Sequence, residues 1–236
     1  RGLFVISAWL NYSTMRATLT ADLLVDEDHI PRIRHYLVDF HGTLGSGYNE
    51  VKRAWEGNEP LVDFDHIWRN LAGFGIWSPS WMRERFPATP AVGRFASATF
   101  DPDRWSPTER LAPFENRLPD DEYWGAKQVV AFSDEDIATI VGTGGYSDPA
   151  AAASIVSTLI DRRNRIAKTY FCKVLPLDNF RVDGGTLRFD DLGAPYAVDD
   201  SPATYTASWF RFDNETGQLT PLHAESFDVP RDVRDA

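Results

Sequence analysis

The chain has 236 residues, of which 43% are hydrophobic and 13% aromatic, a composition typical of a folded globular protein. Its formal net charge of −11 argues against a nucleic-acid partner, because sequence-independent binding to DNA or RNA needs clustered lysine and arginine. No apolar run reaches the roughly 18 residues that a transmembrane helix needs, and the single cysteine, Cys172, excludes an intrachain disulfide.

The N-terminal part of the chain predicts a short helix followed by a β-hairpin. The apolar stretch 1–11 favours the helix. The β-branched and aliphatic runs 18–25 and 33–40, separated by the acidic turn Asp26-Glu27-Asp28-His29, predict a hairpin that leads directly into Asp39. The Gly-, Asn- and Pro-containing residues that follow, up to residue 60, predict an ordered or semi-ordered loop.

Apolar periodicity and capping signals predict the helices of the chain. Ser133 has the form of an N-cap, Ser147-Asp148-Pro149 is typical of a helix start, and Gly142-Thr143-Gly144-Gly145 is typical of a helix C-terminus. The arginines of the last helix are expected on a solvated face, and Cys172 is expected to be a buried, inert thiol. The segment from 75 to about 118, rich in Pro, Trp and Phe, predicts irregular structure. The expected helices cover residues 63–74, 120–132, 134–142 and 149–174, and the arginines are Arg162, Arg163 and Arg165.

From Leu175 onward the pattern changes to strands. One hairpin is predicted around the turn 183–185, and a second joins 205–212 to 218–222. The fold class is therefore α+β, with a mostly helical domain 1–174, a small antiparallel β-module 175–230 and a charged tail 231–236. A sheet of this size is marginal alone, so the module is expected to pack on the helices or on a partner.

A single carboxylate, Asp39, lies between an apolar run and a glycine-rich turn in the segment 36–46. Burying an ionised carboxylate costs several kcal/mol unless a partner compensates it. A divalent metal, the backbone N–H groups of the turn at Gly42, or a nearby arginine are the candidate partners.

This segment resembles the Asp-Phe-Gly element of protein kinases, and more closely its Asp-Phe-Gly-x-x-Leu-Gly form in lipid kinases and other atypical kinases. The resemblance implies that Asp39 holds the magnesium ion that bridges the phosphates of ATP. The hairpin before Asp39 is similar to the ribbon that precedes this element in the kinase C-lobe. Residues 1–171 also resemble an uncharacterised group of bacterial kinase-like proteins. The matching segments are Ala8-Trp9-Leu10-Asn11, Arg16-Ala17, Tyr36 to Ser46, Leu118-Pro119-Asp120-Asp121 and Tyr146-Ser147-Asp148-Pro149.

The chain departs from that pattern at the positions that carry catalysis. The expected acidic pair falls on Ser13-Thr14, the expected Asn falls on Leu19, and His41 replaces the glycine after Asp39-Phe40. These changes remove the expected base and one metal ligand, and Asp22 is the candidate substitute ligand. Neither a Gly-x-Gly-x-x-Gly loop nor a strand lysine precedes Asp39.

Three weaker patterns admit a structural and a functional interpretation. Asp63, Asp65 and His66 suit either a metal site or an acidic helix start, and we favour the helix start. The pairs Asp190-Asp191 and Asp199-Asp200 suit either calcium or acidic turns, and we favour the turns. A phosphate loop at Gly142–Gly145 is disfavoured because the segment follows a helix and lacks the Gly-Lys-Ser/Thr ending.

The resulting hypothesis is a catalytically degenerate kinase-like protein, a pseudokinase, that acts as a binding or structural subunit of a larger assembly with a protein partner. The alternative is a phosphotransferase that uses ATP and magnesium and whose N-lobe is upstream or on another chain. In that case Asp39 and Asp22 hold the metal and Gly42 lies at the nucleotide. A third hypothesis is an accessory subunit without a ligand site. The chain begins at Arg1 and not at Met, so we expect a processed or partial product. The resemblance is compatible with a periplasmic or extracellular location.

Overall fold

The computed structural model describes residues 1–83, 91–183, 186–196, 198, 204–221 and 228–230. The chain divides into two units, unit 1 (Arg1–Val174) and unit 2 (Leu175–Ala236). The described residues combine helices with small antiparallel sheets, which confirms the predicted α+β class.

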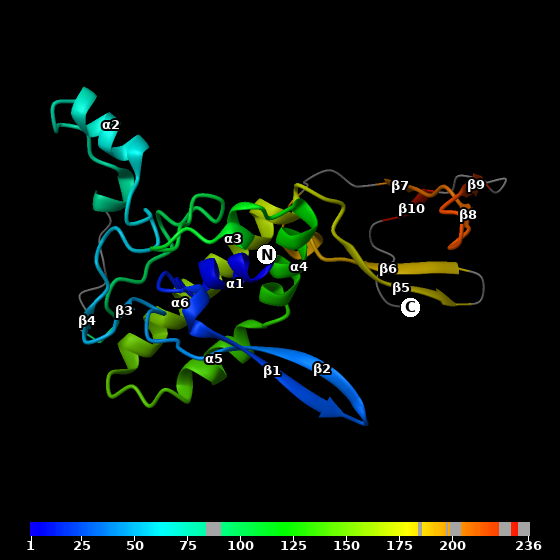
Figure 1. The fold of residues 1–236 in the computed structure, drawn as a ribbon, viewed down its shortest axis with the longest axis horizontal. Coiled ribbons are helices and arrows are strands. Elements are labelled where there is room, and N and C mark those ends of the chain that lie inside the picture. Colours follow the sequence, from blue (N-terminus) through cyan, green and yellow to red (C-terminus); the bar gives the residue numbers. More distant parts are fainter. Residues whose placement is uncertain (84–90, 184–185, 197, 199–203, 222–227, 231–236) are drawn as a thin grey trace. The chain divides into compact units, whose positions relative to one another are not determined.

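Unit 1 contains the α-helices and two short antiparallel ladders (Figure 1). Its elements are α1 (Leu3–Trp9), η1 (Ala17–Leu19), β1 (Thr20–Glu27), β2 (Ile30–Leu37), β3 (Ser46–Gly47), β4 (Glu50–Val51), α2 (Phe64–Ala72), η2 (Ser80–Arg83), α3 (Ala112–Glu115), α4 (Pro119–Val130), α5 (Asp134–Gly142) and α6 (Pro149–Phe171).

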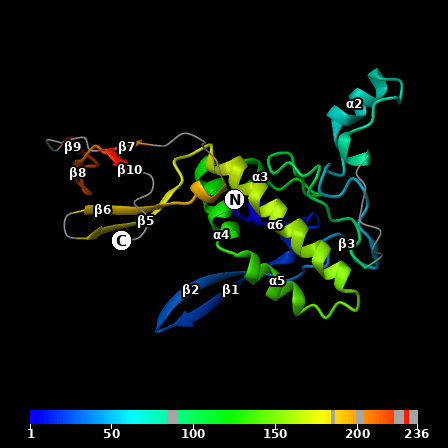
Figure 2. The ribbon, with the colours of Figure 1, turned by 180° about the vertical axis from the view of Figure 1, so that it is seen from behind.

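The core of unit 1 is built around α1, which packs against α4 and α6, while α5 packs against α6 (Figures 1 and 2). Helices α1 and α4 approach closely at Gly125, where a Cβ atom would lie only 2.5 Å from the carbonyl oxygen of Gly2. A larger residue at Gly125 would therefore push these helices apart. Buried core side chains include Phe4, Val5 and Trp9 from α1, Val129 from α4, Ile137 from α5, and Ile155, Leu159 and Ile166 from α6.

The predicted helix caps of the central region are confirmed. The Ser133 hydroxyl accepts a hydrogen bond from Asp136 N at 3.1 Å, and the Asp136 carboxylate accepts one from Ser133 N at 2.9 Å, which forms a capping box. Asp148 caps α6 by accepting from Ala150 N at 2.9 Å. Helix α5 ends at Gly142, and Gly145 adopts a φ of 61°. This segment is thus a helix C-terminus, as predicted.

Two predictions for the end of unit 1 are wrong. Arg162 and Arg163 are buried rather than solvated, and only Arg165 among the three is exposed. Arg163 donates to the carbonyl oxygen of Phe132 at 2.7 Å and pairs with an Asp134 carboxylate oxygen at 2.6 Å. Cys172 is exposed rather than buried, because it follows the last residue of α6 as its C-cap.

The hairpin β1–β2 is confirmed, with different boundaries from those predicted. Asp26 and Glu27 belong to β1, and only Asp28 and His29 form the turn, with φ values of 53° and 64°. Positive φ at both central residues is the requirement of a type I′ turn. Strand β2 ends at Leu37, so it stops before Asp39.

The ribbon β1–β2 leaves apolar side chains exposed along both strands. The cross-strand pair Leu24 and Ile33 is exposed, and so are Leu23 and Ile30. The ribbon therefore buries little of its own apolar surface in the described part of the chain.

Helix α2 lies inside the predicted range 63–74 and begins at the N-cap Asp63, whose carboxylate accepts from Asp65 N and His66 N. The described residues of the segment 75–118, which exclude 84–90, are mostly irregular, as predicted, apart from η2 and α3. Of its tryptophans, Trp105 is buried while Trp68 on α2 is exposed.

Unit 2 is made of short antiparallel ladders. Its elements are β5 (Leu177–Asp183), β6 (Thr186–Asp191), η3 (Ala194–Tyr196), β7 (Thr204–Thr206), β8 (Phe210–Phe212), β9 (Leu219–Pro221) and β10 (Asp228–Pro230). The β5–β6 hairpin is confirmed, although Gly184 and Gly185 of its predicted turn lie outside the described residues.

The second predicted hairpin of unit 2 is only partly correct. Strand β8 pairs with β9, but β7 pairs with β10 instead of continuing the hairpin. Residues 228–230 form a strand at the end of the predicted β-module, and the predicted tail 231–236 lies outside the described residues. Among the described helices, none is both long and apolar enough to cross a membrane.

Candidate functional site

The loop after α1 is fixed by a Schellman motif centred on Asn11. Asn11 has a φ of 51° and donates its N–H to the Ala8 carbonyl at 3.1 Å, while Tyr12 N donates to the Ser7 carbonyl at 2.7 Å. Asparagine tolerates this left-handed conformation better than most residues. The Asn11 side chain is held as well, because its Oδ1 accepts from Trp105 Nε1 at 2.9 Å. The segment that the kinase resemblance aligns with the catalytic loop thus has a defined shape.

The turn after β2 contains Asp39, whose carboxylate is held by His41. The carboxylate accepts from His41 N at 2.9 Å and lies 2.5 Å from His41 Nδ1. The His41 backbone N–H is the main reason that the pKa of Asp39 is lowered, and the His41 side chain adds to it. The Asp39 side chain is 32% exposed. The carboxylate is therefore part-exposed rather than buried. A backbone N–H of the turn, one of the expected partners, holds it, together with the side chain of the histidine that replaces the expected glycine.

The two predicted metal ligands bind different histidines in the described part of the chain. Asp22 lies on β1 and pairs with His35 Nδ1 at 2.6 Å across the ribbon, while Asp39 pairs with His41. Within the described residues, no group of three or more His, Cys, Asp or Glu side chains is arranged to hold a metal ion. Magnesium binding by Asp39 and Asp22 stays a prediction.

The loop after α1 and the turn after β2 meet in the structure. The Tyr12 hydroxyl donates to the backbone carbonyl of Asp39. Gly42 packs so closely on Thr14 that a Cβ at position 42 would lie 2.0 Å from the Thr14 Oγ1 atom. Gly42 therefore has a packing role that any larger residue would disrupt.

At this meeting point lies Lys52, which sequence reasoning did not single out. Its side chain is 1% exposed, and its Nζ donates to Asn11 O at 2.6 Å, Gly42 O at 2.6 Å and Ser13 Oγ at 2.9 Å. Burial lowers the pKa of Lys52 to about 7, while the charge of Glu56 acts in the opposite direction. A lysine in a predicted loop carries no local signal of burial, so the sequence could not have revealed this role.

A cavity of about 500 Å³ lies beside Asn11 in unit 1. Its wall mixes arginine with carboxylate side chains and includes tryptophans, so the lining favours neither sign of charge. Asp63 and His66 belong to this wall, but Asp63 is the N-cap of α2 and His66 pairs with Glu59. The helix-start interpretation of these residues is confirmed.

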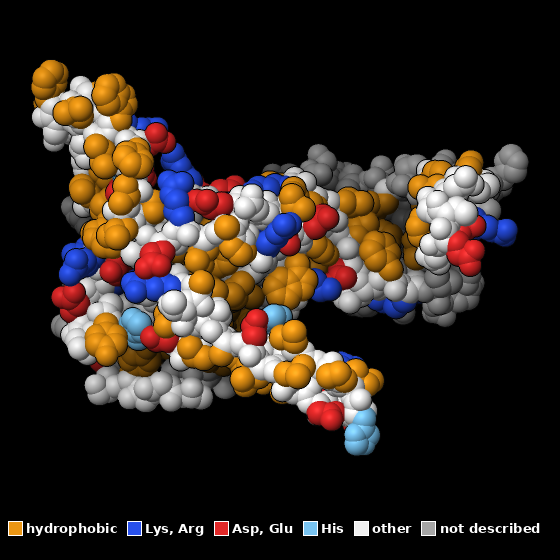
Figure 3. All heavy atoms as spheres, in the orientation of Figure 1, with side chains coloured by type: hydrophobic (Ala, Val, Ile, Leu, Met, Phe, Trp, Pro, Cys, Tyr) orange, Lys and Arg blue, Asp and Glu red, His pale blue; other side chains and the backbone are white. Residues whose placement is uncertain are grey.

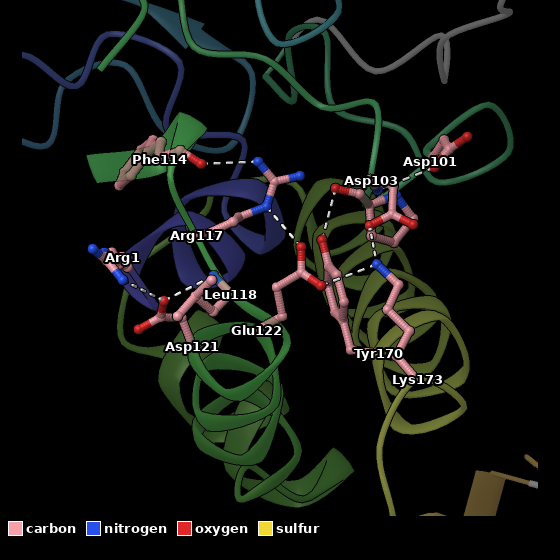
Figure 4. Close-up of polar contacts among 11 residues, drawn as sticks. Arg1, Asp101, Asp103, Phe114, Arg117, Leu118, Asp121, Glu122, Tyr170 and Lys173 are labelled. Atoms are coloured by element: carbon pink, nitrogen blue, oxygen red, sulfur yellow. Dashed lines mark hydrogen bonds and ion pairs between the residues drawn. The ribbon is translucent and has the colours of Figure 1, made fainter. Parts of the chain in front are cut away.

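An ionic cluster around the buried Glu122 ties α4 to the residues just after α6 and to the loop before α3 (Figure 4). The buried carboxylate of Glu122 accepts from Arg117 Nε at 2.8 Å and from Lys173 Nζ at 3.0 Å. Lys173 also reaches Asp103 Oδ1 at 2.7 Å. Burial lowers the pKa of Lys173, but its bonds to Asp103 and Glu122 outweigh this and raise it overall. With each charge paired in this way, the cluster is explained as a structural element.

In unit 2, Asp191, one of the acidic residues considered for calcium, makes hydrogen bonds within the protein. The Asp191 carboxylate accepts from Gly193 N at 2.9 Å, Ala194 N at 3.2 Å and the Tyr205 hydroxyl at 2.7 Å. These bonds support an acidic turn at Asp191. Asp199 and Asp200 lie outside the described residues.

Comparison of the chain with models of known protein families, with curated proteins and with solved structures found no match in any of the three.

Proposed function

We propose that this chain is a kinase-like protein that does not transfer phosphate and that serves as a protein-binding subunit of a larger assembly. The observation that carries the first half is the environment of Lys52. Where the two aligned loops meet, the neutral oxygens of Asn11, Ser13 and Gly42 surround an ammonium group. In a working kinase the corresponding loops bring carboxylates to magnesium and to the substrate hydroxyl.

The lack of a base supports the same proposal. Residues 11–20 contain no carboxylate, and the hydroxyl of Ser13, at the position of an expected acid, accepts a bond from Lys52. General-base and metal assistance each contribute orders of magnitude to a reaction rate. A loop pair that lacks the expected base is thus a poor phosphotransferase.

The second half of the proposal rests on the exposed apolar face of α2, formed by Phe64, Ile67, Trp68 and Leu71 (Figure 3). Phe64 is 77% exposed, Leu71 68% and Trp68 67%. Fully burying one such side chain contributes about 1.5–3 kcal/mol. An amphipathic helix of this kind suits the apolar groove of a protein partner, with anchors at i, i+3, i+4 and i+7.

Calorimetric titration of magnesium and ATP tests the first half. We expect no saturable heat from either the wild-type chain or Asp39→Ala, with both proteins folded by circular dichroism. Saturable binding that requires magnesium and disappears in Asp39→Ala would overturn the proposal.

Site-specific photo-crosslinking in the cells that produce the protein tests the second half. A crosslinker placed at position 68 on the apolar face of α2 should give a discrete adduct with one protein, and Leu71→Glu in the same chain should abolish it. Position 70 on the same helix is the matched control and should give no such adduct. Equal labelling from positions 68 and 70, or no adduct from 68, would contradict a partner groove on α2.

The alternative is an ATP- and magnesium-dependent phosphotransferase completed by an N-lobe from elsewhere. One observation favours it: the lowered pKa of Asp39 keeps this part-exposed carboxylate ionised, beside a second cavity of about 650 Å³ that His41 and Tyr48 line. Under this alternative Asp39 and Asp22 hold the metal. Saturable, magnesium-dependent binding that Asp39→Ala abolishes in the same titration would favour this alternative.

A further inference from the structure

We propose that Lys52 serves unit 1 as a built-in cation, its ammonium group occupying an oxygen-lined cation site formed by the loop after α1 and the turn after β2. This site is called the oxygen cage, and its members are Asn11 O, Ser13 Oγ and Gly42 O. The inference is independent of the proposed function, because it concerns how the two loops are joined and not what they bind.

The number of N–H donors on the Lys52 ammonium matches the number of acceptors in the oxygen cage. A lysine ammonium has three N–H donors and no acceptor. Lys52 Nζ finds acceptors at 2.6, 2.6 and 2.9 Å, and its side chain is 1% exposed. Each donor thus has a partner within the protein, which is the condition for burying such a group.

The chemistry of the cage is that of a site for a hard cation. Carbonyl and hydroxyl oxygens are the ligands that such cations prefer in proteins. A buried lysine ordinarily faces a carboxylate, yet among the described residues the hydrogen-bond partners of Lys52 are these neutral oxygens. The hydrogen bonds to the ammonium are therefore made with oriented dipoles, and the negative charge of Glu56 adds an attraction without a hydrogen bond.

Two backbone hydrogen bonds join the segments of the oxygen cage independently of the Lys52 side chain. Leu44 N donates to Leu10 O at 2.9 Å, and Lys52 N donates to Gly45 O at 3.0 Å. These bonds hold the loop after α1, the turn and the segment of Lys52 together without using Nζ. We therefore expect the cage to persist when the Lys52 side chain is shortened.

Chemical rescue tests the proposal directly. Lys52→Ala removes a three-carbon chain and its ammonium, and n-propylammonium has the same atoms. At pH 6 we expect Lys52→Ala to melt below the wild-type chain. Added n-propylammonium chloride should then raise its Tm saturably, by about 3–6 °C at ten times the dissociation constant. The exposed Lys168→Ala is the matched variant and should show no such rise. Sodium chloride at equal ionic strength and n-propanol are the matched additives.

Rescue by n-propanol as strong as that by n-propylammonium would show a filled cavity and not a cation site, and would overturn the proposal. So would an equal rise in the Tm of Lys168→Ala. If Lys52→Ala does not fold, the nitrogen resonance of Lys52 in the wild-type chain provides the test, with assignment by Lys52→Arg. At pH 6 we expect a slowly exchanging ammonium signal that changes in Ser13→Ala. A neutral-amine signal, or one that Ser13→Ala leaves unchanged, would refute the cage.

Discussion

Replacing Arg162 with methionine should strongly destabilise unit 1, because this buried guanidinium completes the C-terminus of α1. Its Nη2 donates to Ala8 O at 2.5 Å and its Nε to Trp9 O at 3.0 Å, while Nη1 reaches Ala96 O at 2.7 Å. The carbonyls of Ala8 and Trp9 belong to the last turn of the helix, where regular i+4 partners are lacking and a positive charge is favoured. The Ala8 carbonyl also accepts from Asn11 N, so Arg162 is its second donor.

Each bond to a charged donor contributes about 1.5–3 kcal/mol, and contributions of bonds that share one donor group do not add fully. We therefore expect Arg162→Met to lower the free energy of unfolding by about 3–5 kcal/mol, as for other buried charged groups that lose a partner. In a domain of this size the Tm should fall by about 6–20 °C. Urea and thermal unfolding followed by circular dichroism measure both quantities.

The matched control is Arg165→Met, on the same helix but exposed, with a single long bond of 3.5 Å to Phe100 O. It should change the free energy of unfolding by no more than about 0.5 kcal/mol. Equal losses in the two variants, or a loss below about 1 kcal/mol for Arg162→Met, would refute the argument from burial and hydrogen bonding.

Three further predictions concern other described contacts. Glu122→Gln should lower the free energy of unfolding, measured in urea, by about 3–5 kcal/mol, because Arg117 and Lys173 lose the carboxylate that they share. Glu115→Gln, which affects an exposed ion pair, should lower it by less than about 1 kcal/mol. The free energy of unfolding should rise by about 2–3 kcal/mol from pH 7.5 to 9.5. Over this range the unfolded chain keeps a proton on Lys52, whereas the folded chain, in which the pKa of Lys52 is about 7, has released it. The variant Lys52→Met should lack this rise. Gly42→Ala should lower the Tm, through a loss of about 1–3 kcal/mol, because the new methyl group meets Thr14, and an unchanged Tm would contradict the packing described.

The central helices could be predicted because their signals are local. Ser133 and Asp148 act within a few residues of themselves, and the apolar periodicity of α6 is visible in its own sequence. The environment of Arg162 could not be predicted in this way. Its partners Ala8, Trp9 and Ala96 are distant in sequence, and only the packing of α1 on α6 brings them together.

The candidate site was predicted in part. The motif around Asp39 drew attention to the turn that meets the loop of Asn11, but the packing of Gly42 on Thr14 was not predicted. A backbone N–H partner of Asp39 in the turn was among the expected alternatives. Its side-chain partner was missed because His41 was taken only as a departure from a pattern, although an Asp and a His two residues apart in a turn can pair directly. Lys52 was missed because its burial depends on the contact between two loops.

The hydrogen bonds between α1 and α6 also set an order of events during synthesis. Trp9 Nε1 donates to Leu159 O across a separation of 150 residues, and Arg162 lies 153 residues beyond Trp9. At 5–20 residues per second, the ribosome makes that length of chain in roughly 8–30 s. During this interval the Trp9 indole N–H and the carbonyls of Ala8 and Trp9 lack the partners that α6 supplies. The C-terminus of α1 therefore reaches its final hydrogen-bonded state only after most of unit 1 has been made.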